Sequence, residues 1–167
     1  LPNGTGLRLE APARTDDRAL PDPALQRDCE MTPSQIVSAL VDRINEHDVD
    51  GVCALMEPDG AFIDGLGLSV NGREAIRKAW LSYFAMVPDY WIRVECQLQQ
   101  GTVVGVFGEA GGTFTADGRL DVANRWAVPA AWQAVVGDKG ISVWHVFADN
   151  EPVRQIMSRV AKNAAAR

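Results

Sequence analysis

The sequence predicts an α+β fold in which N-terminal helices pack on a curved antiparallel sheet. Apolar residues recur at helical spacing through the first half, alternate with polar residues after Tyr90, and return to helical spacing near the end. The chain has 167 residues, of which 47% are hydrophobic and 23% are charged. This length and composition are typical of one compact domain.

Residues 1–30 precede the first helical pattern. They contain four prolines among alternating charges and have neither helical nor strand periodicity, which predicts an extended or disordered tail. Met31 stands directly before a helix start signal, so two interpretations stay open: the thirty residues lie upstream of the true start, or they form a docking arm. We therefore divide the chain into a tail, 1–30, and a folded domain, 31–167.

Two helices and a short strand are predicted at the start of the domain. Thr32-Pro33-Ser34-Gln35 combines an N-cap, a first-turn proline and a capping-box glutamine. Apolar residues then recur at helical spacing over 36–44, and a shorter helix is predicted over 49–56. Pro58-Asp59-Gly60 has turn chemistry, so we expect it to end this helix before a short strand at 61–64.

A third helix, a run of strands and a closing helix complete the domain. Asn71-Gly72 predicts a turn, after which 74–87 has helical spacing. Beyond Tyr90 the period becomes two. The predicted strands cover 91–96, 102–107 with a continuation or bulge at 111–114, 122–136 with a kink at Pro129, and 141–148. The last helix is predicted over 152–166.

Charge and cysteine usage exclude several classes of protein. Sixteen basic and 22 acidic residues give a net charge of −6, and no dense Lys/Arg cluster offers a surface for nucleic acid. Cys29, Cys53 and Cys96 fit neither a disulfide framework nor a CxxC zinc site, and there are only two histidines. No apolar stretch approaches the ~18 residues of a membrane span. We therefore predict a cytoplasmic protein with no metal, cofactor, nucleic-acid partner or membrane partner.

Five segments carry a resemblance to a known superfamily. They are the run 48–64, Asn71-Gly-Arg-Glu-Ala-Ile76, Met86-Val-Pro-Asp89, the stretch 112–119 and Trp144-His-Val-Phe-Ala-Asp149. Together they resemble the nuclear transport factor 2-like superfamily, which includes ketosteroid isomerase, scytalone dehydratase, limonene epoxide hydrolase and the SnoaL-like polyketide cyclases. The resemblance covers residues 32 to about 160. It implies a cone-shaped sheet with an internal pocket for a small, largely apolar organic molecule, and a homodimer through the outer sheet face.

Asp64 is the first candidate catalytic residue. The resemblance to ketosteroid isomerase implies a proton-transfer base at this position on the first strand. A lone carboxylate between Ile63 and Leu66-Gly67-Leu68 is also expected to be partly desolvated, which suits that role. The alternative is that Asp64-Gly65 forms a solvated turn at the end of the strand.

The other catalytic residues of ketosteroid isomerase have no counterpart in this sequence. The resemblance places Leu40 where that family has an oxyanion-stabilising tyrosine, and Trp132 where it has a protonated aspartate. Val146 stands where the epoxide hydrolase pattern needs a carboxylate. Loss of one oxyanion donor typically costs about 10²–10³ in rate, so neither steroid isomerisation nor epoxide hydrolysis is expected.

The resemblance also implies which side chains line the pocket: Trp80, Tyr83, Trp126, Trp132, Trp144, Val146 and Arg125. Ordinary core packing is the alternative for each tryptophan, and an ion pair with Asp121 is the alternative for Arg125. Strand alternation places His145 on the face opposite Trp144, away from the pocket. The face of Glu109 stays open, because glycines flank it.

We therefore predict a SnoaL-like protein that binds a small, largely apolar organic molecule. In the enzymatic hypothesis Asp64 is the general base of an isomerase, cyclase or lyase, and Trp132 or Arg125 steadies the developing negative charge. The alternative is a non-catalytic ligand-binding or dimerisation module of the same fold.

Overall fold

The computed structural model describes residues 31–165, and the predicted tail at 1–30 lies outside the described residues. Four helices, a 3₁₀ turn and six strands make up this part of the chain: α1 (Pro33–Asn45), α2 (Val49–Leu55), β1 (Met56–Ile63), β2 (Ser69–Asn71), α3 (Arg73–Met86), β3 (Trp91–Gln100), β4 (Val103–Thr113), η1 (Val122–Asn124), β5 (Arg125–Gly137), β6 (Gly140–Ala148) and α4 (Glu151–Ala165). No helix in this range is long and apolar enough to cross a membrane.

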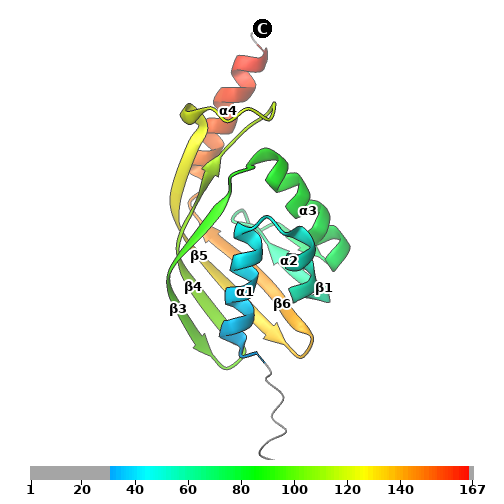
Figure 1. Cartoon of the computed structure of the whole chain (residues 1–167). Helices are drawn as coiled ribbons and strands as arrows, with labels where there is room; N and C mark the ends of the chain where they lie inside the picture. The colour runs from blue at the N-terminus through cyan, green and yellow to red at the C-terminus, as the bar shows by residue number, and fades with distance from the viewer. Residues whose placement is uncertain (1–30, 166–167) are drawn as a thin grey trace, which may run out of the picture. The chain divides into compact units, whose positions relative to one another are not determined.

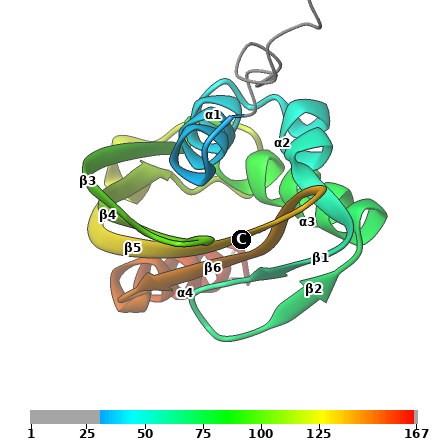
Figure 2. The same cartoon turned by 90° about the horizontal axis from the view of Figure 1, so that it is seen from below.

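The six strands form one curved sheet in the order β2-β1-β6-β5-β4-β3. All neighbours pair antiparallel except β1 and β6, which run parallel. Figures 1 and 2 show α1, α2 and α3 on one side of the sheet. We call this side the inner face and the opposite side the outer face. The predicted α+β architecture, with helices on one face of a curved sheet, is confirmed.

The capping box predicted for the first helix is present. The Gln35 backbone N–H donates to Thr32 Oγ1 at 3.3 Å, and the Thr32 N–H donates to Gln35 Oε1 at 2.8 Å. These bonds satisfy two backbone donors that a helix start leaves free. Four apolar side chains of α1 are buried against the inner face: Val37, Leu40, Val41 and Ile44.

The first strand is longer than the sequence predicts. It begins at Met56 rather than Ala61, and it pairs Met56 with Ile141 and then Ala61 with Val143. The extra residues between these two pairs form an irregularity in the ladder, which accommodates Pro58-Asp59-Gly60. The prediction that this tripeptide separates helix from strand is wrong, because a bulge tolerates a proline that cannot donate a ladder bond.

Among the long strands only the β4–β5 ladder keeps one register, since β3–β4 shifts between Val94 and Cys96 and β5–β6 shifts between Val135 and Val136. The β4–β5 pairing runs without a shift from Val103 to Thr113, across the glycines of β4 and across Pro129. Since β6 pairs with β5 only from Ala130 onward, Pro129 stands outside that ladder. The strand predicted from 122 starts at Arg125 instead, because the Asp121 carboxylate accepts from the Ala123 N–H and caps η1.

Burial alternates along β5 and defines the core. The buried positions on this strand are Trp126, Val128, Ala130, Trp132, Ala134 and Val136. They face the helices, while the residues between them point outward. At one end of the domain α4 follows β6, close to the end of α3 (Figure 1), and buries Ile156 in the same core.

Candidate ligand-binding site

Six aromatic side chains on the inner side of the sheet contact one another. Trp80, Tyr83 and Phe84 share one side of α3 because they are three and four residues apart. Their rings meet aromatic side chains from the loop before β3, from β1 and from β5. We call the set the aromatic layer: Phe62, Trp80, Tyr83, Phe84, Tyr90 and Trp126.

The aromatic layer is continuous from β1 to β5. Ring centroids are 5.5 Å apart for Phe62 and Trp80, 6.4 Å for Trp80 and Tyr90, and 6.2 Å for Tyr90 and Trp126. Tyr83 and Tyr90 meet edge to face at 5.1 Å. Such pairs contribute roughly 0.5–1.5 kcal/mol beyond simple burial. The ring contacts therefore stabilise the packing of α3 against the inner face.

Both tyrosines stay neutral in this setting. Burial raises the pKa of Tyr83, and burial together with the nearby Tyr83 raises the pKa of Tyr90 well above its ordinary value. The phenols are therefore hydrogen-bond donors at neutral pH rather than phenolates. His47 fixes the loop that carries Tyr90, because its Nε2 lies 2.8 Å from the Tyr90 carbonyl oxygen and its ring packs on Phe84.

Trp132 and Trp144 form a second aromatic group further along the sheet. Trp132 pairs with Val146 and Trp144 pairs with Ala134, so the two indoles are diagonal neighbours on the inner face of β5 and β6. Their ring centroids lie 6.3 Å apart with an interplanar angle of 15°. They are 2% and 1% exposed.

Three tryptophans carry a buried N–H without a partner. Within the described part of the chain, the Nε1 atoms of Trp126, Trp132 and Trp144 have no hydrogen-bond acceptor and are covered from solvent. An unsatisfied buried donor typically costs about 1–3 kcal/mol, and native proteins leave few of them. We call these three residues the unpaired indoles.

Asp64 stands at the end of β1. Its Oδ1 accepts from the backbone N–H groups of Leu66 and Leu68, at 2.8 and 2.9 Å. The carboxylate therefore anchors the β1–β2 hairpin loop, which is the turn geometry that the sequence left as an alternative. No hydrogen bond to Oδ2 is present among residues 31–165, and the side chain is only partly exposed.

Small residues cover the sheet between the two aromatic groups. Ala110, Val128 and Ala130 line the inner face of β4 and β5. Val146 and Ala148 face the same way on β6 but are only partly buried. The inner face is therefore accessible at this end of β6. The β1–β6 register, carried one residue past the pair Ile63 and His145, places Asp64 beside Val146.

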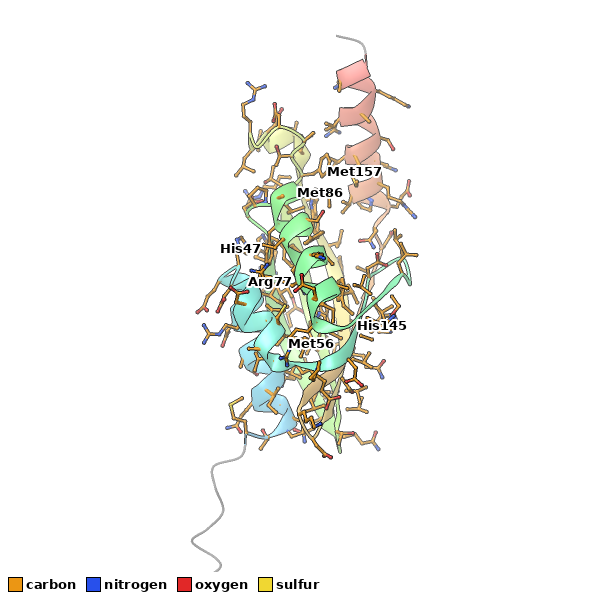
Figure 3. All side chains as sticks on the ribbon, turned by 90° about the vertical axis from the view of Figure 1, so that its right-hand side faces the viewer. His47, Met56, Arg77, Met86, His145 and Met157 are labelled. Carbon is orange, nitrogen blue, oxygen red and sulfur yellow. The ribbon has the colours of Figure 1, made fainter. Side chains whose placement is uncertain are left out.

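Three further candidate residues lie on the outer face. Arg125 is exposed and follows the alternation opposite Trp126, and no ion pair joins it to Asp121 within 31–165. Glu109 pairs with Arg93 across the outer face at 2.6 Å. His145 packs on Phe147, and Figure 3 places it on the side of the sheet away from α1. The structure thus separates Arg125 from the other predicted pocket residues, which share the inner face.

The aromatic layer contains three residues that the sequence analysis did not assign to the pocket. Phe62 and Phe84 were accessible to pattern arguments, because they fall at strand and helix positions that face the core. Tyr90 was not, since it lies in a loop between α3 and β3 where no period defines a face.

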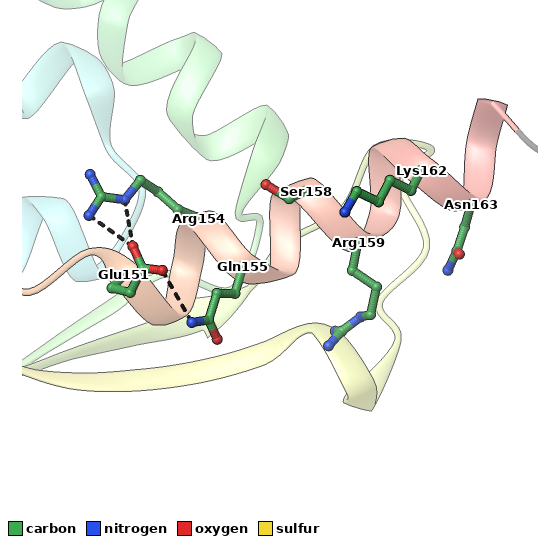
Figure 4. Close-up of a pocket in the computed structure, with 7 residues that line it drawn as sticks. All are labelled: Glu151, Arg154, Gln155, Ser158, Arg159, Lys162 and Asn163. Atoms are coloured by element: carbon green, nitrogen blue, oxygen red, sulfur yellow. Dashed lines mark hydrogen bonds and ion pairs between the residues drawn. The ribbon is translucent and has the colours of Figure 1, made fainter.

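The described residues offer neither a second site for an apolar molecule on α4 nor a set of metal ligands. A surface hollow along α4 is lined by polar and charged side chains of that helix alone, with Glu151 bonded to Arg154 and Gln155 (Figure 4). Across 31–165, no three His, Cys, Asp or Glu side chains are grouped to hold a metal ion.

Comparison with known families identifies the domain. The family model described as the SnoaL-like domain matches residues 37–155, which is more than half of the chain. The chain belongs to the SnoaL-like domain family. The predicted resemblance to SnoaL-like proteins is thereby confirmed, and the ketosteroid isomerase-like fold is shared with a solved structure. A search of curated proteins finds no match.

Solved structures share the fold of this SnoaL-like domain at low sequence identity. One is a protein of ketosteroid isomerase-like fold from Catenulispora acidiphila in complex with trimethylamine, with 20% identity, a TM-score of 0.65, and coverage of 73% of this chain and 91% of that chain. A candidate SnoaL-like polyketide cyclase from Shewanella denitrificans has 13% identity, a TM-score of 0.66, and coverage of 76% and 97%. IdmH, a candidate polyketide cyclase from Streptomyces antibioticus, has 21% identity, a TM-score of 0.64, and coverage of 77% and 99%.

Proposed function

We propose that this SnoaL-like domain binds a small, largely apolar organic molecule on the inner face of its sheet, and that Asp64 acts on this molecule as a general base. One observation carries the proposal: aromatic and small apolar side chains share the inner side of the sheet, and Val146 and Ala148, near Asp64, are only partly buried. Apolar walls with a few polar groups are typical of small-molecule sites.

The ligand is expected to be flat and mostly apolar. Trp80 of α3 and the small residues Ala110, Val128 and Ala130 of β4 and β5 belong to the same apolar interior. Such an apolar lining suits a ring system rather than a sugar or a phosphate ester, because few charged groups belong to it. The trimethylamine complex and the candidate polyketide cyclases among the structural neighbours support a small organic ligand.

The geometry of Asp64 supports proton transfer. Two backbone N–H groups hold Oδ1 in place, which leaves Oδ2 to accept a proton. In the proposed step a C–H bond beside a carbonyl breaks, the proton moves to Oδ2, and the electron pair moves onto the carbonyl oxygen. Return of the proton to another atom of the same molecule completes the cycle. This step is common to isomerases, cyclases and lyases.

Hydrogen exchange at a carbon acid tests the base directly. We expect the full-length protein to catalyse deuterium incorporation into 2-tetralone in D₂O, followed by NMR. Asp64→Asn should lower the rate at least a hundredfold, because an amide cannot accept the proton. Asp59→Asn, an exposed carboxylate on the same strand, should leave it unchanged. Equal rates in the protein and Asp64→Asn would contradict the role of Asp64.

A second role, homodimer formation, is favoured by the outer face. We define the outer patch as nine neighbouring side chains: Leu98, Val103, Phe107, Ala131, Gln133, Val135, Val143, His145 and Phe147. Leu98, Phe107 and Phe147 are 62%, 46% and 49% exposed. The outer patch contains no Asp, Glu, Lys or Arg, so a second copy seated on it meets no like charge.

We also propose that the protein works in the cytoplasm. Among residues 31–165, Cys53 and Cys96 are the two cysteines and they form no disulfide with each other. Free cysteines are typical of a reducing compartment, and an exposed thiol such as Cys96 is poorly suited to an oxidising one.

A further inference from the structure

Charge is distributed unevenly between the end of the domain that carries α4 and the rest of the domain. The loop 114–125 and α4 together contain five Lys or Arg residues and three Asp or Glu residues. The other described residues contain six Lys or Arg residues and 13 Asp or Glu residues. One end of an otherwise acidic domain therefore has an excess of positive charge. The field of the whole domain directs an acidic partner to this end and away from the rest.

Three cations at this end have no carboxylate partner. Arg125, Arg159 and Lys162 are exposed and form no ion pair within residues 31–165. Arg159 instead donates to two neutral acceptors, the Ala123 carbonyl oxygen and Asn124 Oδ1. Figure 4 shows its side chain extending from α4 towards the loop before β5. The charges of all three side chains are therefore available to the carboxylates of a partner.

The loop beside these cations presents apolar side chains on a hydrogen-bonded backbone. Leu120 and Val122 are 54% and 83% exposed. The Phe114 N–H donates to the Asn124 carbonyl oxygen at 3.1 Å and closes the loop, while the Asp121 carboxylate caps η1. These bonds hold the loop in a shape that leaves both apolar side chains in water. Exposed apolar side chains rimmed by polar residues are typical of a contact with another protein.

We infer that Leu120, Val122, Arg125, Arg159 and Lys162 form a docking surface for an acidic protein segment that carries apolar side chains beside its carboxylates. We call these five residues the cationic patch. Complementary charge selects the partner, and the two apolar side chains provide area that binding removes from water. Nucleic acid and an anionic membrane fit less well, because an extended polyanion also meets the acidic remainder of the domain.

A labelled peptide tests the cationic patch on the full-length protein. The probe is a helical peptide of Glu, Leu and Ala, and the readout is its dissociation constant from fluorescence anisotropy. We expect binding that weakens at least threefold when the ionic strength rises from about 0.05 to about 0.2 M, because salt screens exposed charges. A matched peptide with Lys in place of Glu should not bind. A matched peptide with Ser in place of Leu should bind more weakly.

Surface substitutions locate the binding site of the peptide. Arg125→Glu and Lys162→Glu should each raise the dissociation constant at least fivefold, because an attraction becomes a repulsion. Lys139→Glu makes the same change of charge at another exposed lysine without an ion pair among residues 31–165, and it should alter the constant less than twofold. Val122→Ser should raise it at least threefold, since the serine buries less apolar area.

NMR of the unmodified protein provides a measurement that does not depend on variants. The peptide should shift backbone amide signals most strongly in the ranges 119–125 and 158–163. Absence of peptide binding, or an equal loss of affinity in Lys139→Glu and Lys162→Glu, would overturn the cationic patch. Tighter binding of phosphatidylglycerol vesicles or of a DNA duplex than of the acidic peptide would overturn the assignment of its partner to an acidic protein.

Discussion

The inner and outer faces of the sheet are both apolar, but they differ in what covers them. On the inner face α1 and α3 bury the side chains, and aromatic rings with donor groups are concentrated there. On the outer face no helix of residues 31–165 covers the outer patch, and its aliphatic and phenylalanine side chains face solvent.

This difference separates two kinds of recognition. A covered face with unpaired donors can select a small molecule by hydrogen bonding, because the donors are already desolvated. An open face with apolar side chains and no net charge gains most from covering a large area, which a second copy of the chain would provide in the proposed dimer. Strand alternation lets one sheet carry both.

The largest expected difference between the faces is in stability. Trp144→Ala removes an indole from the core, and we expect it to lower the free energy of unfolding by about 3–5 kcal/mol. Phe147→Ala, three residues later on the outer face, should cost less than about 1 kcal/mol in dilute protein. Urea unfolding followed by circular dichroism measures both. Similar losses at the two positions would show that the outer face is packed as tightly as the inner one.

The tyrosines provide a pH test of the inner face. Burial raises the pKa of Tyr83 and Tyr90 in the folded protein, whereas an unfolded tyrosine titrates near pH 10. Below that pH both states are neutral, so stability is unaffected. Above it only the unfolded state loses protons, and stability falls by about 1.4 kcal/mol per pH unit for each tyrosine.

Absorbance at 295 nm distinguishes the two states. These are the only tyrosines in the chain, so tyrosinate should form only as the protein unfolds, and circular dichroism should change at the same pH. Tyrosinate that forms with normal titration in the folded protein would mean that the aromatic layer is open to solvent.

A single lysine substitution tests whether the outer patch is a dimer interface. Phe147→Lys should raise the dissociation constant of the dimer at least tenfold, because the interface would bring two lysines together. Sedimentation velocity gives this constant. Leu81→Lys changes an exposed residue on α3 and should have no effect. A wild-type protein that is monomeric at high micromolar concentration would exclude the outer patch as a dimer interface.

The smallest effect is expected at the ion pair on the outer face. Arg93 and Glu109 are 2.6 Å apart, but their side chains are 61% and 34% exposed. Arg93→Ala should therefore change the free energy of unfolding by less than about 1 kcal/mol. Chemical unfolding of Arg93→Ala and Glu109→Ala measures it. If both variants lost more than 2 kcal/mol in the free energy of unfolding, the Arg93–Glu109 ion pair would have to be buried in solution.

Local patterns were sufficient to predict most of the fold. The capping box of α1 follows from neighbouring residues alone and is as the sequence predicts. Alternation places His145 opposite Trp144, as the structure has it, but the choice of which face is the inner one came from the family resemblance. The start of β1 was missed because it depends on a partner strand far along the chain: Met56 joins the sheet through Ile141, and no local signal at Pro58-Asp59-Gly60 reports that pairing.

The candidate site was predictable in part. Alternation within β5 is sufficient to place Trp126 and Trp132 on one face, whereas the face they share with Trp144 depends on how β5 pairs with β6. The same rule separates Arg125 from Trp126, since consecutive strand residues point to opposite faces. The unpaired state of the indoles could not be predicted, because it depends on which acceptors three-dimensional packing brings within reach.

The parallel pairing of β1 with β6 has a consequence for how the protein is made. Its two strands lie about eighty positions apart in the sequence, so their contact closes a very long loop. Because closing such a loop costs much chain entropy, this pairing is expected to form late in folding. The hairpins of β3 to β6 close far shorter loops. During synthesis Asp64 emerges early, yet it reaches Val146 only after the last strand has left the ribosome. The proposed active site is therefore absent from every nascent chain that ends before β6, and it forms only when the whole sheet is complete.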